Sequence, residues 1–197
     1  METLHQTAAQ LRRRKFEACV FENSAAAVAD ICARITGKAV GLGGSISVKE
    51  IGLGDEMPKH AAQVFGHEPG GAGADERNSL TADIFIASVN GLSQDGQVVN
   101  IDGTGNRIAA TCFGPKELFW VVGKNKIVPT LEDALARAKQ TAVRLAAFYG
   151  RNTPCGKTGK CEECLSLECV CSVTTIHRKR PTGLKVTVYL INEELGM

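Results

Sequence analysis

Asp83-Ile84-Phe85-Ile86-Ala87-Ser88-Val89 is the stretch that decides the fold of this chain. Its apolar residues run almost without interruption instead of alternating with polar ones, which is typical of a parallel strand covered on both faces. The turn dipeptides Asn90-Gly91 and Asp95-Gly96 follow it, and residues 97–101 form a second short apolar run. The sequence therefore predicts a buried parallel strand followed by a hairpin.

Strand-like and helix-like segments alternate on both sides of this stretch. The patterns predict helices over 3–15, over 24–35 after a cap at Asn23-Ser24, and over 131–149 after a cap at Thr130. They predict further strands over 16–21, 38–42, 118–123 and 184–191, whereas the polar stretch 58–78 is expected to be partly loop. Such alternation indicates the α/β class.

Length and composition set broad limits on the function. A chain of 197 residues can form one domain with a full core, and its net charge of +2 does not indicate a nucleic-acid partner. No apolar run reaches the ~20 residues that span a bilayer, so no membrane insertion is expected. The polar start, without a signal peptide, predicts a cytoplasmic protein. The oligomeric state stays open, a homo-oligomer included.

Five of the eight cysteines lie in one short segment, Cys155-x5-Cys161-x2-Cys164-x6-Cys171 with Cys169 between the last two. Thiols stay reduced in the cytoplasm, so a disulfide framework is not expected. Four thiolates suit zinc or an iron–sulfur (Fe-S) cluster, with Cys169 in reserve for the last position. Lys157 and Lys160 can offset the negative charge. Reduced, unligated cysteines are the alternative.

A glycine–serine loop, Gly41-Leu42-Gly43-Gly44-Ser45-Ile46-Ser47, follows the strand expected over 38–42. Glycines allow the backbone to approach an anion, and the amides at a helix start favour negative charge, with Ser45 and Ser47 as extra donors. Ile46 stands where a dinucleotide fingerprint has its third glycine. A tight structural turn explains the loop equally well.

A second polar, glycine-rich group follows the buried strand. Open α/β sheets bind ligands at the carboxyl ends of their strands. Arg107 can hold a carboxylate or phosphate through two parallel hydrogen bonds, and Asp102 and Asn106 can position a hydroxyl. The alternative is that these residues only form turns and cap a helix. The candidate ligand residues of the two groups are Gly43, Gly44, Ser45, Ser47, Asn90, Asp95, Asn100, Asp102, Gly103, Gly105, Asn106 and Arg107.

Taken together, several of these stretches resemble the LUD-domain (lactate-utilisation) family, in particular its short, stand-alone members with a C-terminal cysteine segment. The resemblance lies in residues 82–107, in Phe113-Gly114-Pro115-Lys116, in residues 121–128 and in the glycine–serine loop. It implies a Rossmann-like three-layer α/β domain similar to the sugar-phosphate isomerases and coenzyme A transferases. The domain spans 1–150, the cysteine-rich loop 151–172, and a strand within 173–197 completes the same domain.

The resemblance also implies a function. Some relatives belong to systems that oxidise L-lactate with iron–sulfur partner subunits, so this chain is expected to be an accessory or catalytic component of organic-acid utilisation. It would bind a small anionic metabolite, with Asp95, Asp102 and Arg107 as candidate catalytic residues and redox subunits as candidate partners. It lacks the ferredoxin motif C-x2-C-x2-C-x3-C-P and an assignable coenzyme A transferase glutamate.

Two other functions stay open. A sugar-phosphate or acyl-CoA enzyme would bind phosphate at the Ser45–Ser47 loop and use Asp95 or Asp102 as general base. A non-catalytic, metal-stabilised interaction or sensor protein would need the cysteines but no catalytic group. Fold alone does not choose among the three.

Overall fold

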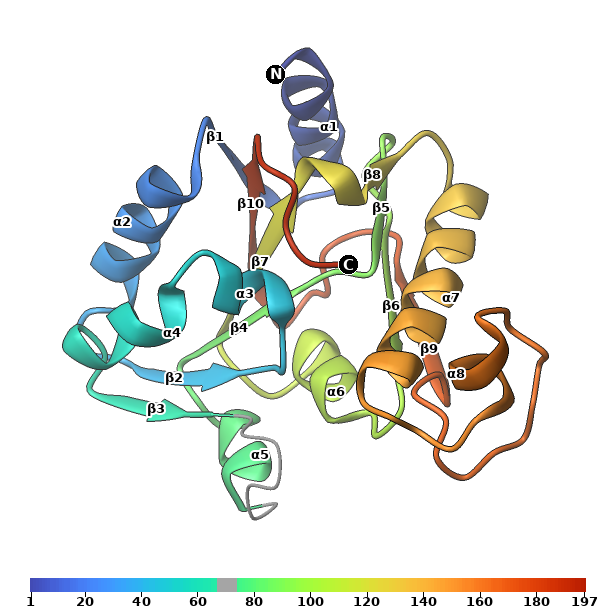
Figure 1. Cartoon of the computed structure of the whole chain (residues 1–197). Coiled ribbons are helices and arrows are strands. Elements are labelled where there is room, and N and C mark those ends of the chain that lie inside the picture. Colours follow the sequence, from blue (N-terminus) through green and yellow to red (C-terminus); the bar gives the residue numbers. More distant parts are fainter. Residues whose placement is uncertain (67–73) are drawn as a thin grey trace.

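The computed structural model describes residues 1–66 and 74–197, and it is an α/β protein built around a parallel sheet (Figure 1). The central sheet has six strands in the order β1-β10-β7-β4-β2-β3, and every neighbouring pair is parallel. Its strands are β1 (Glu17–Phe21), β2 (Ala39–Leu42), β3 (Gln63–Phe65), β4 (Ile84–Ser88), β7 (Glu117–Gly123) and β10 (Lys185–Ile191).

A second sheet of four strands lies beside the first. Its order is β8-β5-β6-β9, with β5 (Gly91–Ser93), β6 (Val98–Asp102), β8 (Ile127–Val128) and β9 (Val173–His177). Strands β5 and β6 pair antiparallel as a hairpin after Val89, and Gly96 takes the positive φ of 89° that its turn requires. The Asn90-Gly91 pair, expected as a turn, instead leads into β5. The long antiparallel ladder of β6 with β9 was not foreseen from the sequence.

The helices cover both faces of the central sheet. They are α1 (Glu2–Arg13), α2 (Ser24–Ile35), α3 (Ile46–Glu50), α4 (Leu53–Glu56), α5 (Ala74–Ser79), α6 (Asn106–Cys112), α7 (Leu131–Phe148) and α8 (Pro154–Thr158), with short 3-10 turns η1 (Met57–Lys59) and η2 (Lys124–Lys126). Residues of α2, α3 and α4 form one core with one face of the sheet, and α1 and the β5–β6 hairpin form another with the opposite face. Helix α7 covers the outer face of the second sheet.

Strand β4 shows why the fold follows from its sequence. All five of its residues are buried: Ile84 and Ile86 pack in the core with α2–α4, while Phe85 and Ala87 pack in the core with α1. A strand covered on both faces needs apolar residues at every position, which the run over 83–89 supplies. The expected α/β, Rossmann-like three-layer architecture is confirmed.

Capping residues in the sequence also predicted where two of the helices begin. The Asn23 side chain accepts a hydrogen bond from the Ala26 amide, and Thr130 and Asp133 form a reciprocal capping box at the start of α7. In the polar stretch 58–78, residues 67–73 lie outside the described part of the chain. Within 1–66 and 74–197, no helix is long and apolar enough to cross a membrane.

Candidate functional site

Lys126 is a buried lysine at the carboxyl edge of the central sheet, three residues after β7 ends at Gly123. Its side chain reaches back toward the sheet, and its Nζ donates to the Ser47 hydroxyl of α3 and to the Ser88 hydroxyl at the end of β4, each at 2.8 Å. Each serine in turn donates onward, Ser47 to the Leu195 carbonyl and Ser88 to the Val121 carbonyl. Three separate elements thus meet at one ammonium group.

The surroundings of Lys126 do not favour its charge. Burial, then the nearby Arg137 and Arg107, lower the pKa of Lys126 from its ordinary 10.5 to about 7, and Glu50 opposes them as a weaker influence. Both hydrogen-bonded partners are neutral hydroxyls, and no ion pair to Lys126 is found within the described residues. A cation without a contacting carboxylate is ready to receive an anion.

Residues 193–197 cover this lysine. Gly196 lies so close that an added Cβ would come within 2.5 Å of the Ser47 Oγ and 3.3 Å of the Lys126 Nζ, and its φ is +66°. The Gly196 amide donates to Glu50 at 2.5 Å, and the Leu195 amide donates to the Asn125 Oδ1 at 3.0 Å. The glycine is therefore required both for conformation and for close contact.

Arg137 of α7 borders the same region from the other side. Its guanidinium donates to the carbonyls of Asn90, Asn125 and Met197, the last at 2.9 Å. Burial is the main cause that lowers the pKa of Arg137. Beside it lies an open polar cavity of about 610 Å³, lined by Asn125, Ala136, Arg137, Gln140, Thr141, Arg144, Glu194, Gly196 and Met197. A half-buried arginine, Arg137, and an exposed one, Arg144, thus border this cavity next to the segment that covers Lys126.

Arg107, a candidate ligand residue, uses its guanidinium to join secondary-structure elements. It donates to the Asn100 Oδ1 at 2.9 Å, to the Asn90 Oδ1 at 3.1 Å and to the Ile101 carbonyl at 2.6 Å. Asp102 adds an ion pair to these hydrogen bonds, with its Oδ2 at 3.5 Å from the Arg107 Nε. The geometry shows an interior cross-link between β4, the hairpin and α6, and a ligand role for Arg107 stays a prediction.

The glycine–serine loop contributes one side chain directly to the lysine. Ser47 is 1 % exposed and contacts Lys126, while Ser45 caps α3 by accepting from the Val48 amide at 3.3 Å. The Gly43 amide donates to the Ile86 carbonyl, and a Cβ at Gly43 would meet the Arg107 side chain at 3.0 Å. Glycine at 43 therefore allows Arg107 to pass between the loop and the sheet.

The other candidate residues fall in two places. Asn90, Asn100, Asp102, Gly103, Gly105 and Asn106 lie around Arg107, at the base of the hairpin and the start of α6. Asp102 accepts from the Thr104 and Gly105 amides, a turn arrangement. Asp95 lies at the tip of the hairpin instead, half exposed, where it pairs at 2.7 Å with Arg14, the residue after α1. Partial burial opposes the shift, but the Ser93 and Gln97 side chains, then Arg14, hold the pKa of Asp95 below its usual range.

All eight cysteines are free thiols. Cys161, Cys164 and Cys171 line one cavity beside α7, and Cys155 is buried on α8. Across residues 1–66 and 74–197, no three cysteine, histidine or acidic side chains already stand in a metal-coordinating arrangement. The cysteine ligands and the metal therefore stay a prediction.

Sequence reasoning missed Lys126, Ser88 and Arg137. Lys126 follows a turn-like Lys124-Asn125 pair, and nothing in its local pattern distinguishes it from an exposed lysine. The available signal was its place just after the end of a buried strand. In open parallel sheets this edge is where ligand-binding residues lie.

The fold and this edge define a class: a Rossmann-like α/β protein with a buried, basic site at the carboxyl ends of its parallel strands. The model of the LUD domain matches residues 4–191, and the chain belongs to the LUD-domain family, which is associated with lactate utilisation. A crystal structure of a DUF162 family protein from Deinococcus radiodurans is similar at a TM-score of 0.55 and 16 % identity, over 96 % of each chain, which supports the fold alone. No curated protein matches this chain.

Proposed function

We propose that this protein binds a small metabolite carboxylate at Lys126 and serves lactate or related organic-acid utilisation as an accessory or catalytic component. The observation that carries the proposal is Lys126, which is 5 % exposed and whose ammonium, within the described residues, donates to the hydroxyls of Ser47 and Ser88 and to no carboxylate. A buried cation of this kind is costly to stability unless an anion uses it.

Hydrogen-bond donors around the site support an anionic ligand. Ser47, Asn125 and Arg137 all donate to main-chain carbonyls of residues 195–197. These carbonyl oxygens stand where the oxygens of a carboxylate would be held, because both are hydrogen-bond acceptors. A ligand that displaces this segment would gain the same donors together with the charge of Lys126, and charge-assisted bonds are about twice as strong as neutral ones.

The open cavity supports entry from the α7 side. It has room for a metabolite, and Arg137 and Arg144 give it positive charge next to Gly196 and Met197. An anion attracted there would need only to displace residues 195–197 to contact Lys126. The family association with lactate utilisation favours a small organic acid as that anion.

A thermal-shift panel tests the proposal. L-lactate and pyruvate are compared with ribose 5-phosphate and coenzyme A, each with wild type, Lys126→Met and the matched control Lys124→Met, whose lysine is exposed. A ligand at a hundredfold excess over its Kd adds about 2.7 kcal/mol to the stability of the folded state. We expect a monocarboxylate to raise the melting temperature of wild type and Lys124→Met but not of Lys126→Met.

Each alternative gives a different result. A rise with the phosphate compounds alone, lost in Lys126→Met, supports the sugar-phosphate or acyl-CoA enzyme instead. No rise with any of the four compounds, or a rise that persists in Lys126→Met, contradicts an anion site at this lysine.

A further inference from the structure

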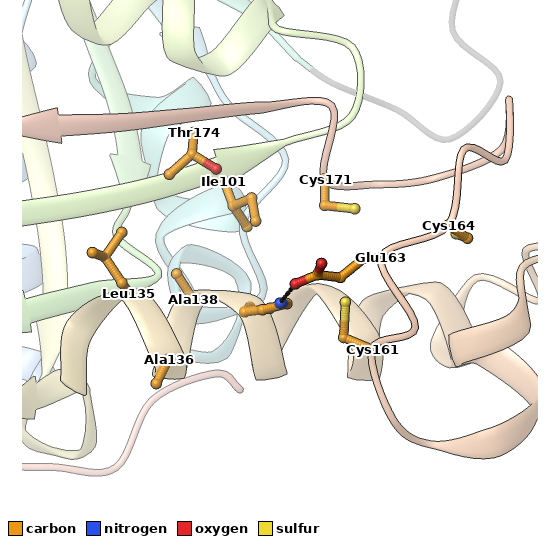
Figure 2. A pocket seen from close by; sticks show the side chains of 10 residues that line it. Ile101, Leu135, Ala136, Ala138, Cys161, Glu163, Cys164, Cys171 and Thr174 are labelled. Atoms are coloured by element: carbon orange, nitrogen blue, oxygen red, sulfur yellow. Dashed lines mark hydrogen bonds and ion pairs between the residues drawn. The ribbon is translucent and has the colours of Figure 1, made fainter. Parts of the chain in front are cut away.

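The cysteine segment surrounds a space of its own on the far side of α7 from the central sheet. A cavity of about 420 Å³ lies between α7 and the chain after α8, and Cys161, Cys164 and Cys171 line it together with Ile101, Leu135, Ala136, Ala138, Lys139, Glu163 and Thr174. Figure 2 shows these three cysteines around one space beside the helix. Residues up to ten positions apart in the sequence thus line one cavity.

Cys171 is the centre of this cluster. Its thiol interacts electrostatically with those of Cys155, Cys161 and Cys169. Cys155 sits on α8, where it packs against Val143, Ala146 and Val170. Three thiols besides Cys171 therefore lie close to it, and Cys164 lines the same cavity.

The backbone between Cys161 and Cys164 turns sharply. Glu163 has a φ of +50°, one of two positive values among the described non-glycine residues, and Gly159 has +73°. A non-glycine residue in this region is uncommon and is held there by its surroundings. The turn brings both sulfurs of the C-x2-C pair to the same cavity.

Burial of apolar side chains fixes this loop at one end only, where Val170 and Cys171 pack against buried apolar residues of α7. Residues 159–172 contain no helix or strand, and Leu165 and Leu167 are 99 % and 104 % exposed. The other fixed points are polar, among them the ion pair of Glu163 with Lys139 at 2.7 Å and the Asn152 amide bound to Glu168 at 2.9 Å. A metal cross-link would add ordering energy to the rest of the loop.

We propose that Cys161, Cys164 and Cys171, which line the space that Figure 2 shows, bind one thiophilic metal centre together with a fourth thiol from Cys155 or Cys169 beside it. Each thiol loses its proton to solvent as it becomes a ligand, and the loop over 159–172 closes on the metal, since its sulfurs do not yet stand in a coordinating arrangement. Cys155 and Cys169 compete for the fourth position: each sulfur contacts a neighbouring hydroxyl at 3.3 Å, that of Thr153 or of Ser172, and neither residue lines the cavity.

The chemistry of four thiolates is shared by a zinc ion and an iron–sulfur cluster. Lys139 supports either, since its ammonium lies near the thiols of Cys161 and Cys171 as well as Glu163. A positive group beside the thiolates offsets part of their charge. The centre is independent of the anion site, so Lys126→Met is expected to keep its metal.

The test begins with protein purified under nitrogen, in which zinc, iron and sulfide are measured per chain. We expect about one zinc per chain, or iron with sulfide if the centre is a cluster. The protein is then stripped and titrated with Co²⁺ alone, which should give thiolate-to-cobalt charge-transfer absorption. Stripped protein is also reconstituted with Fe²⁺ and sulfide, and the metal that restores the native thermal stability identifies the centre.

Variants decide the ligands. Cys161 is exposed, so Cys161→Ser should keep the native circular dichroism while its affinity for Co²⁺ falls on the order of 100-fold or more. Of Cys155→Ser and Cys169→Ser, the one that removes the fourth ligand should behave likewise, whereas the exposed control Cys112→Ser should bind as wild type does. Metal-free protein that does not bind Co²⁺, or equal loss in Cys161→Ser and Cys112→Ser, overturns the proposal. Unchanged affinity in both Cys155→Ser and Cys169→Ser overturns a centre of four thiolates.

Discussion

Replacing Lys126 by methionine should make this protein more stable at neutral pH while removing its ability to bind an anion. Methionine has a similar length and no charge, so it fills the same space without the burial of an ammonium group. Residues that form binding sites commonly reduce stability, and their replacement by apolar ones raises it. The expected gain can be worked out from the pKa of the lysine.

In the unfolded chain Lys126 has its ordinary pKa of 10.5, and in the folded protein burial holds it at about 7. Between these pH values the unfolded chain binds more protons than the folded one, so the stability of wild type rises with pH across this window. Burial of Lys126 therefore costs the least free energy above about pH 10.5. The free energy of unfolding of wild type decreases as the pH falls from there toward about 7. One pKa unit corresponds to about 1.4 kcal/mol, so the full difference is roughly 5 kcal/mol.

Methionine removes this pH-dependent cost but also the two hydrogen bonds to Ser47 and Ser88. Each serine keeps its own donation to a carbonyl, so the loss is about 1 kcal/mol for each bond. The net gain near pH 7 is then about 3 kcal/mol. For a domain of this size that corresponds to a rise in melting temperature of roughly 6–12 °C.

Urea unfolding followed by circular dichroism, at about pH 6.5 and at about pH 9, measures both the gain and its pH dependence. Lys124→Met is the control, since it removes an exposed lysine two positions earlier. From about pH 6.5 to about pH 9, the free energy of unfolding of wild type and of Lys124→Met should rise more than that of Lys126→Met. A Lys126→Met protein that is less stable than wild type near pH 7, or that has the same pH dependence, would refute the reasoning.

Four further outcomes are expected. Gly196→Ala should raise the affinity for a carboxylate up to about tenfold in calorimetric titrations, because the added Cβ would push residues 195–197 away from Ser47. Weaker binding would show that this segment helps to hold the ligand. Carboxylate affinity of wild type should be constant below about pH 7 and fall about tenfold per unit above it, since Lys126 must then take up a proton; a flat profile to about pH 9 would exclude that role. Arg107→Gln should cost about 3 kcal/mol or more in urea unfolding, because Asp102 loses its buried partner. Asp95→Asn should change stability by less than about 1 kcal/mol and leave carboxylate binding as it is, because its pair with Arg14 is at the surface; loss of binding would place a ligand at the hairpin tip.

Much of the fold could be predicted because its signals are local. The apolar run over 83–89, the Asp95-Gly96 turn and the Thr130–Asp133 cap each correspond to an element that the structure contains, whereas Gly91 begins strand β5 instead of forming a turn with Asn90. Pairing across the sheets could not be predicted in the same way. Strand β10 lies between β1 and β7 in the central sheet. Strand β9 pairs with β6, although about seventy residues separate these two strands in the chain.

The site was harder to predict than the fold. Ser47 was expected at an anion site, and it does contact the buried lysine, but Lys126 itself looked like an ordinary turn residue. Its environment comes from the ends of β4 and β7 and from α3, which only the tertiary structure brings together. Metal identity, redox partner subunits, a homo-oligomer and cytoplasmic location stay predictions.

A crystal structure of the protein with pyruvate or L-lactate would test the central claim most directly. The account predicts a carboxylate within hydrogen-bonding distance of the Lys126 Nζ and the Ser47 Oγ, with residues 195–197 displaced from their present contacts. A carboxylate bound elsewhere, with Gly196 still packed over Lys126 at saturating ligand, would contradict it.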